Sequence, residues 1–208
     1  MKTASILSVM IFLTTMQRPT APDSRPVILA FGDSLTAGYR VQHGAGYPEQ
    51  LQKKLDALGY KYRVVNMGIN GDTSSGGRAR MKAALAEKPS IVILELGAND
   101  GLNGVPVTQM QRNLEEMIRD FQKAGTKVIL AGMTLPRNYG ATYVKSFEDV
   151  YKDLAGRYNV PLIPFFLEGV AGNPRYTIGN DDVLHPNAEG YVLVTETVMK
   201  TLLPLLKK

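Results

Sequence analysis

The sequence predicts an α/β protein with three layers, in which helices cover both faces of a parallel β-sheet. Short apolar runs rich in β-branched residues alternate along the chain with longer amphipathic stretches. Almost every residue of these runs is apolar, as expected for strands of a parallel sheet that is buried on both faces. The strict alternation of strand and helix favours right-handed crossovers between neighbouring parallel strands.

Each run and each stretch is assigned to one element. Strands are predicted at Val27–Phe31, Tyr62–Asn66, Ile91–Leu96, Val128–Met133 and Leu162–Phe165. Helices are predicted at Tyr47–Leu58, Ser74–Glu87, Thr108–Ala124, Tyr143–Tyr158 and Asn187–Leu206. Gly59 and Gly125 follow two of these helices, as is typical of helix C-termini, and Thr108 is expected to cap the start of the helix that Gly125 follows. No linker divides residues 26–208, which are predicted to form one domain.

The first 25 residues have the layout of a secretory signal. Lys2 precedes the 13-residue, mostly apolar run Ala4–Met16, and a polar, Pro-rich segment, Thr20–Pro26, follows it. The run is shorter than the ~20 residues that a membrane-spanning helix needs. No A-x-A cleavage site follows it, so an uncleaved N-terminal anchor remains an alternative. We expect no stable membrane insertion once the signal is removed.

The composition excludes several kinds of chemistry. The chain contains no cysteine, which rules out disulfides, thiol nucleophiles and cysteine-ligated zinc. Its two histidines, His43 and His185, are too few for a multi-histidine metal site, so we expect no metal and no cofactor. The net charge is +5, but the basic residues are scattered among acidic ones, and we predict no binding to nucleic acid. His43 is interpreted as a surface residue.

Polar or glycine-rich blocks follow the predicted strands, and ligands bind at the carboxyl ends of strands in such sheets. Ser34 follows the first strand among small residues, where its hydroxyl could be exposed. The N–H of Gly71, after the second strand, could point into a site. Asn99, after the third, offers an amide that can donate to an oxyanion. Taken singly, each block is more typical of a turn or a helix cap.

The last block contains a candidate acid and base. Asp182 and His185 are three residues apart, and Pro186 resembles a proline in the first position of the last helix. Asp182 can accept a hydrogen bond from one ring nitrogen, which leaves the other nitrogen to take a proton from Ser34. The alternative for His185 is an ordinary surface histidine in a loop.

Together, the four blocks resemble the GDSL family of SGNH hydrolases, from Val27 to the C-terminus. The resemblance implies a flavodoxin-like sheet of strand order 2-1-3-4-5. It also implies that Ser34 is the nucleophile, with Asp182 and His185 as its acid and base. The oxyanion hole would comprise the N–H groups of Ser34 and Gly71 and the side chain of Asn99. Gly32-Asp33-Ser34-Leu35-Thr36 differs from the G-x-S-x-G elbow of the α/β-hydrolases.

Within this family, the sequence most resembles bacterial periplasmic enzymes described as thioesterase I, arylesterase and lysophospholipase. Three stretches support this: Gly71–Ser74, Leu135–Gly140 and Val160–Phe166. The resemblance implies an esterase acting on small carboxylic esters, acyl thioesters or lysophospholipids, in the periplasm or outside the cell. Leu135 and Pro136 resemble a wall of the family's acyl groove, and the loop Gly101–Val107 could move on binding.

Three other interpretations remain open. The same fold and triad could act as a carbohydrate O-acetyl esterase, which the motifs do not distinguish. A non-catalytic binding module on a flavodoxin-like scaffold would have no need of Ser34, Asp182 and His185 together. A protein of the membrane surface could use the basic charge and the N-terminal run. We expect a monomer.

Overall fold

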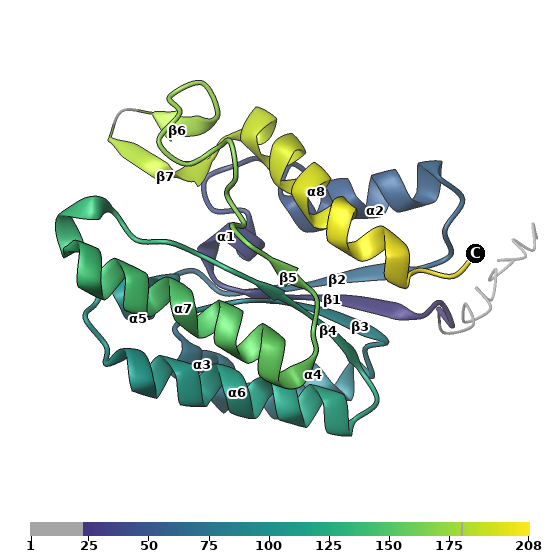
Figure 1. Cartoon of the computed structure of the whole chain (residues 1–208). Coiled ribbons are helices and arrows are strands. Elements are labelled where there is room, and N and C mark those ends of the chain that lie inside the picture. Colours follow the sequence, from purple (N-terminus) through teal and green to yellow (C-terminus); the bar gives the residue numbers. More distant parts are fainter. Residues whose placement is uncertain (1–22, 180) are drawn as a thin grey trace, which may run out of the picture.

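The computed structural model describes residues 23–179 and 181–208, so most of the signal-like segment 1–25 lies outside the described residues. Its centre is a five-stranded parallel sheet of order β2-β1-β3-β4-β5, which confirms the predicted fold class (Figure 1). The strands are β1 (Val27–Gly32), β2 (Arg63–Gly68), β3 (Ile91–Glu95), β4 (Lys127–Ala131) and β5 (Leu162–Ile163). Every residue of β1 and β3 is buried, as the apolar runs predicted.

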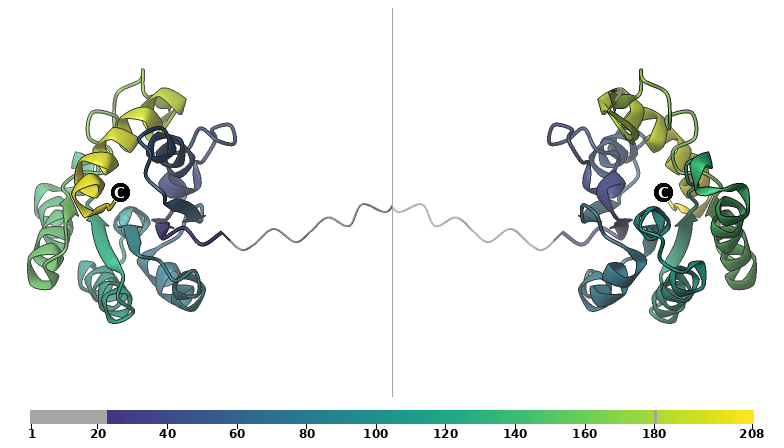
Figure 2. Two further views of the ribbon diagram at one scale, coloured as in Figure 1. Left: turned by 90° about the vertical axis from the view of Figure 1, so that its right-hand side faces the viewer. Right: turned by 90° about the vertical axis from the view of Figure 1, so that its left-hand side faces the viewer.

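Helices cover both faces of the sheet. The helix α2 (Tyr47–Ala57) lies beside α8 (Ala188–Leu202) on one face, and α3 (Ser74–Ala79), α6 (Val107–Lys123) and α7 (Ala141–Tyr158) lie on the other (Figure 1). The same two groups are seen from the sides in Figure 2. Aromatic pairs fill both interfaces: Phe31 packs edge-on against Phe121, and Tyr47 against Phe166.

The short elements complete the chain. They are the helices α1 (Ser34–Ala37), α4 (Met81–Ala86) and α5 (Ala98–Leu102), the 3-10 turns η1 (Arg137–Tyr139) and η2 (Leu203–Leu205), and the strands β6 (Thr177–Gly179) and β7 (Asp182–Pro186). Among the described residues, no helix is long and apolar enough to cross a membrane.

Several predicted boundaries differ from the structure, and three of the differences bear on how the elements form. The expected helix Ser74–Glu87 is two helices, because Arg80 leaves the helical conformation, with φ −103° and ψ 10°. The fifth strand is limited to Leu162–Ile163, since prolines flank it and lack the N–H that a sheet requires. Thr108 does not cap α6: this helix begins at Val107 after Pro106, so Thr108 lies in its first turn. Gly59 and Gly125 do follow helix ends, each with φ +81°.

The antiparallel hairpin of β6 and β7 was not predicted. It carries Asp182 and His185, which the sequence had placed in a segment without regular structure. The interpretation of Pro186 as the first helical residue is wrong, because Pro186 is the last residue of β7. Asn187 caps α8 instead, and its side chain accepts a hydrogen bond from the N–H of Gly190 at 2.9 Å.

Candidate active site

Ser34 lies where the first strand of the sheet turns abruptly into a helix. Asp33 caps this single turn, its carboxylate accepting from the N–H of Leu35 at 3.0 Å. A Cβ at Gly32 would lie 2.1 Å from Thr36 Oγ1 and 2.5 Å from Glu95 Oε2, so only glycine fits there. The tight turn leaves the Ser34 side chain half-buried at the carboxyl edge of the sheet.

A continuous line of hydrogen bonds joins Ser34, His185 and Asp182. Ser34 Oγ lies 3.0 Å from His185 Nε2, although the two residues are 151 positions apart in the sequence. On the other side of the ring, Nδ1 lies 2.8 Å and 2.9 Å from the two carboxylate oxygens of Asp182. The β6–β7 hairpin lies next to α1 (Figure 1), and it brings the imidazole within hydrogen-bonding distance of the first residue of that helix.

The Asp182 carboxylate is held in its charged form by the hairpin around it. Partial burial raises the pKa of Asp182, but hydrogen bonds from the ring and the backbone N–H of His185 outweigh this and lower it overall. The backbone N–H of His185 donates to Asp182 Oδ1 at 3.1 Å. The ring of Tyr39 lies 4.8 Å from that of His185, between ring centroids. The imidazole is thus fixed in position as well as paired.

The loop that carries Gly71 and the helix α5, which carries Asn99, meet beside Ser34. Asn99 Nδ2 donates to Asp33 Oδ2 at 3.0 Å and to the carbonyl of Asp72 at 2.9 Å. Gly71 has φ +75°, a conformation that favours glycine. Within residues 23–179 and 181–208, no acceptor is recorded for the N–H groups of Ser34 and Gly71. These two donors are free to bind a ligand, whereas Asn99 would have to share or release one of its present partners.

Sequence reasoning missed a set of hydrogen bonds that joins α5, which follows the third strand, to α3. Asp100 is buried and accepts from the N–H of Ser74 at 2.7 Å and from its hydroxyl at 2.5 Å. Asn113, on α6, in turn donates to Ser74 Oγ at 2.9 Å. The signal in the sequence is an aspartate directly after Asn99, a pattern that is by itself typical of a turn.

Sequence reasoning also missed two buried carboxyl groups near Ser34, those of Glu95 and Asp33. Glu95 is fully buried at the end of β3, where Thr36 Oγ1 donates to its Oε2 at 2.8 Å. Burial is the main cause that raises the pKa of Glu95 well above its usual range, and the neighbouring Asp33 raises it further. Burial likewise raises the pKa of Asp33 to about 6. The signal was a single acidic residue inside an apolar strand run.

A small cavity of about 70 Å³ opens beside the Ser34 hydroxyl. Ser34, Asn99 and His185 line one side of it. Most of the remaining lining is apolar and includes both predicted groove residues: Leu35, Ala98, Leu102, Met133, Leu135, Pro136, Leu167 and Leu184. His43 is exposed and does not line it, in agreement with its interpretation as a surface residue.

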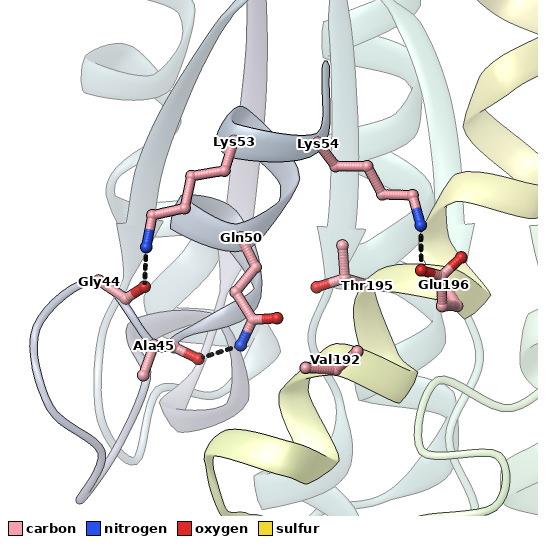
Figure 3. Close-up of a pocket in the computed structure, with 8 residues that line it drawn as sticks. All are labelled: Gly44, Ala45, Gln50, Lys53, Lys54, Val192, Thr195 and Glu196. Atoms are coloured by element: carbon pink, nitrogen blue, oxygen red, sulfur yellow. Dashed lines mark hydrogen bonds and ion pairs between the residues drawn. The ribbon is translucent and has the colours of Figure 1, made fainter. Parts of the chain in front are cut away.

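A larger surface hollow, of about 520 Å³, lies between α2 and α8, and neither Ser34 nor His185 lines it (Figure 3). Its two lysines already have partners: Lys54 pairs with Glu196, and Lys53 Nζ donates to the carbonyl of Gly44 at 3.1 Å. Among the residues that the structure describes, no cluster of three acidic or histidine side chains could hold a metal ion. The apolar cavity at Ser34 is therefore the better candidate site.

A serine, a histidine and an aspartate joined in this way at the carboxyl edge of a parallel sheet are the arrangement of a serine hydrolase. Comparison with known proteins then identifies the family of hydrolases to which the chain belongs. The chain belongs to the GDSL-like lipase/acylhydrolase family, whose model matches residues 30–193. This confirms the resemblance drawn from the four sequence blocks.

Named relatives agree with this membership. The chain is 44% identical to esterase TesA of Pseudomonas aeruginosa, over 86% of this chain and 89% of that one. It is 39% identical to thioesterase 1/protease 1/lysophospholipase L1 of Escherichia coli K12, over 86% and 84%. The crystal structure of the psychrotrophic esterase EstA from Pseudoalteromonas sp., inhibited by monoethylphosphonate, superposes with a TM-score of 0.81 at 35% identity, over 86% and 97%. The protein is an enzyme of the GDSL esterase and thioesterase class.

Proposed function

We propose that this protein is an exported serine esterase in which Ser34 is the nucleophile, His185 the general base and Asp182 the acid of a catalytic triad. Its proposed substrates are small carboxylic esters, and also acyl thioesters and lysophospholipids. The observation that carries the proposal is the unbroken line of hydrogen bonds from Ser34 Oγ through the His185 ring to Asp182.

In the first half of the reaction, Ser34 Oγ attacks the carbonyl carbon of the substrate while its proton passes to His185 Nε2. The carbonyl electrons move onto oxygen and form a tetrahedral oxyanion. When this collapses, the bond to the leaving alcohol or thiol breaks, and His185 returns the proton to the leaving group. Water then attacks the acyl-enzyme with His185 again as base, and releases the acid and free Ser34.

The oxyanion is stabilised by donors at the junction of three loops. Among the residues that the structure describes, the N–H groups of Ser34 and Gly71 have no protein acceptor, and the Asn99 amide joins them by exchanging one of its partners for the oxyanion. Loss of one such donor typically lowers the rate about 10²- to 10³-fold. In the charged Asp182, both carboxylate oxygens face the ring and stabilise the imidazolium that forms during attack.

The apolar lining of the cavity supports acyl chains as the part of the substrate that is bound. Leu135 and Pro136 form one wall, and Leu102 and Leu184 stand near them. Removing such apolar surface from water favours binding by roughly 25 cal/mol per Å². A carbohydrate O-acetyl esterase would instead need polar groups around the acetyl-bearing sugar, and the cavity supplies few.

The activity is tested with the purified full chain, a Ser34→Ala variant and a matched control, Ser75→Ala, which alters an exposed serine of α3. The substrates are p-nitrophenyl acetate, butyrate and octanoate. We expect hydrolysis by the first and third proteins and its near-complete loss in Ser34→Ala. Equal activity of Ser34→Ala would refute the triad, and a strong preference for acetate over octanoate would favour the carbohydrate esterase.

Export is tested separately. The full chain and a version without residues 2–25 are expressed in a Gram-negative host, and esterase activity is measured in the periplasmic and cytoplasmic fractions. We expect the full chain in the periplasm and the shortened chain in the cytoplasm. Equal distribution of the two proteins would contradict the assignment of residues 1–25 as a signal.

A further inference from the structure

The side chain of Arg80 lies beneath the loops of the proposed oxyanion hole. Arg80 occupies the break between α3 and α4, and only 13% of its side chain is exposed. Its Nε lies 2.7 Å from Asp72 Oδ2, and the Asp72 side chain is only 10% exposed. Neither group faces the cavity beside Ser34, and the triad mechanism uses neither.

The rest of the guanidinium joins the ends of two strands. Nη1 donates to the carbonyl of Met67 at 2.7 Å, and Nη2 donates to the carbonyl of Gly32 at 2.8 Å. Met67 lies at the end of β2, and Gly32 ends β1, two residues before Ser34. The guanidinium carbon also lies 3.9 Å from the centre of the Phe31 ring, over its face. A lysine has one nitrogen and cannot reproduce this planar fork.

The two segments that Arg80 contacts carry two of the three proposed oxyanion donors, and one of them also binds the third. Gly32 leads into Ser34. Met67 and Asp72 bracket the turn that contains Gly71. The carbonyl of Asp72 accepts from Asn99 Nδ2 at 2.9 Å, so the position of Asp72 also determines where the Asn99 amide lies. One buried cation is thus connected to all three donors without touching the substrate.

We infer that Arg80 is the positioning residue of the oxyanion hole: it sets the relative positions of the Ser34 N–H, the Gly71 N–H and the Asn99 amide. The inference rests on the proposed function and adds to it a residue outside the four sequence blocks. Because these donors act on the charge that develops in the transition state, displacing them lowers kcat and leaves KM largely unchanged.

The test compares Arg80→Met, Arg80→Ala and Arg80→Lys with the same three changes at Arg78. Arg78 is a matched control, since it lies on α3 two residues earlier and forms ion pairs with Glu116 and Asp120 on α6. Thermal unfolding establishes that each variant is folded, and kcat and KM are measured on p-nitrophenyl butyrate. For folded Arg80 variants we expect kcat about 10- to 100-fold lower with KM within about threefold, and for Arg78 variants kcat within about twofold.

Chemical rescue separates positioning from general stability. Arg80→Ala leaves a space beside the Asp72 carboxylate. Millimolar guanidinium chloride is therefore expected to restore part of the kcat of Arg80→Ala and to leave the kcat of Arg78→Ala unchanged. Full kcat in a folded Arg80 variant would overturn the inference. Failure of all three Arg80 variants to fold while the Arg78 variants fold would also overturn it, in favour of a role in stability. Full activity of Ser34→Ala would instead refute the proposed function itself.

Discussion

At the scale of single residues, His185 is constrained from two sides. Both oxygens of Asp182 face its Nδ1, and the Tyr39 ring lies next to it, tilted by 52° to the imidazole. This pairing puts the ring proton on Nδ1 and leaves Nε2, 3.0 Å from Ser34 Oγ, able to accept. The orientation of one imidazole therefore depends on a carboxylate three residues earlier in the same strand.

Asp182→Asn is expected to remove most of the activity without unfolding the protein. The amide N–H₂ of asparagine donates to Nδ1 and forces the ring proton onto Nε2, which then cannot accept from Ser34. We expect kcat to fall about 10³- to 10⁴-fold, as in other triads with this change. The measurement is kcat on p-nitrophenyl butyrate, with the exposed neighbour changed in Asp181→Asn as the control. A loss of less than tenfold would contradict the role of Asp182.

Glu95 makes the stability of the fold depend on pH. Its pKa in the folded protein lies well above the ordinary 4.5, because burial opposes its charge. As the pH rises past 4.5, the unfolded chain releases this proton while the folded chain keeps it. The free energy of unfolding therefore falls by up to about 1.4 kcal/mol per pH unit until the folded pKa is reached.

The prediction is checked by urea unfolding of the natural protein and Glu95→Gln at pH 5 and pH 8. Glutamine resembles the neutral acid but does not titrate, so the natural protein should lose stability relative to the variant between these two values. Glu168→Gln, at an exposed position, should follow the natural protein. Parallel changes in all three proteins would show that Glu95 is ionised throughout.

At the scale of elements, Asn187 connects the β6–β7 hairpin to α8. Its carbonyl oxygen caps the helix, while its Nδ2 donates to the carbonyls of Arg175 at 2.8 Å and Thr177 at 3.0 Å. His185 lies two residues before it, so the same side chain that begins the helix also holds the strand that presents the imidazole.

Two substitutions of Asn187 separate its capping of α8 from its hydrogen bonds to the hairpin. Asn187→Ala removes the cap and both donors, and is expected to cost about 1–2 kcal/mol of stability. Asn187→Ser retains a cap but is too short to reach the two carbonyls, so it should be more stable than the alanine variant. Both should lower kcat, by up to about tenfold, because small misplacements of a catalytic group are costly. Urea unfolding and kcat measured on both proteins check this; an unchanged kcat in both would show that the hairpin is held by other contacts.

Elements with a strong apolar pattern could be predicted from the sequence, and those held by specific polar contacts could not. The strands β1, β3 and β4 are runs of buried aliphatic residues, and their positions were predicted within two residues. The β6–β7 hairpin is half-exposed and has no alternation of apolar and polar residues. The break at Arg80 interrupts a helical pattern because its guanidinium turns inward to three acceptors, which no local propensity indicates.

At the scale of the whole molecule, stability depends on the buried core far more than on surface charge. Phe121 is fully buried and packs edge-on against Phe31, with ring centroids 5.8 Å apart. The ion pair between Lys54 and Glu196 joins α2 to α8, but about a third to a half of each side chain is exposed, at 34% and 48%. Solvent and salt therefore screen this pair.

We expect Phe121→Ala to lower the free energy of unfolding by about 3–5 kcal/mol, since it leaves a cavity between the sheet and α6. Lys54→Gln should change it by less than about 1 kcal/mol. Urea unfolding at low and at high salt measures both. A large, salt-dependent loss in Lys54→Gln would show that the contact between α2 and α8 depends on charge.

The candidate site could be predicted because Ser34 and Asn99 come shortly after strands of the sheet, and because the four sequence blocks resemble the GDSL family, which implies the strand order. Ser34, Asn99 and His185 were named from the sequence, and the structure brings them to one cavity. The supporting residues Arg80, Asp100 and Glu95 were not, because each contacts a partner that is 26 to 59 positions away in the sequence and that only folding brings near.

The separation of 151 residues between Ser34 and His185 has a consequence for how the protein is made. Under the proposed roles, a ribosome completes the nucleophile early and supplies its base only within the last 24 residues of 208. An unfinished or C-terminally truncated chain thus carries a serine of ordinary reactivity. Hydrolysis therefore requires a chain that has been synthesised at least through His185 and has folded, so the order of the residues in the sequence keeps an unfinished chain inactive.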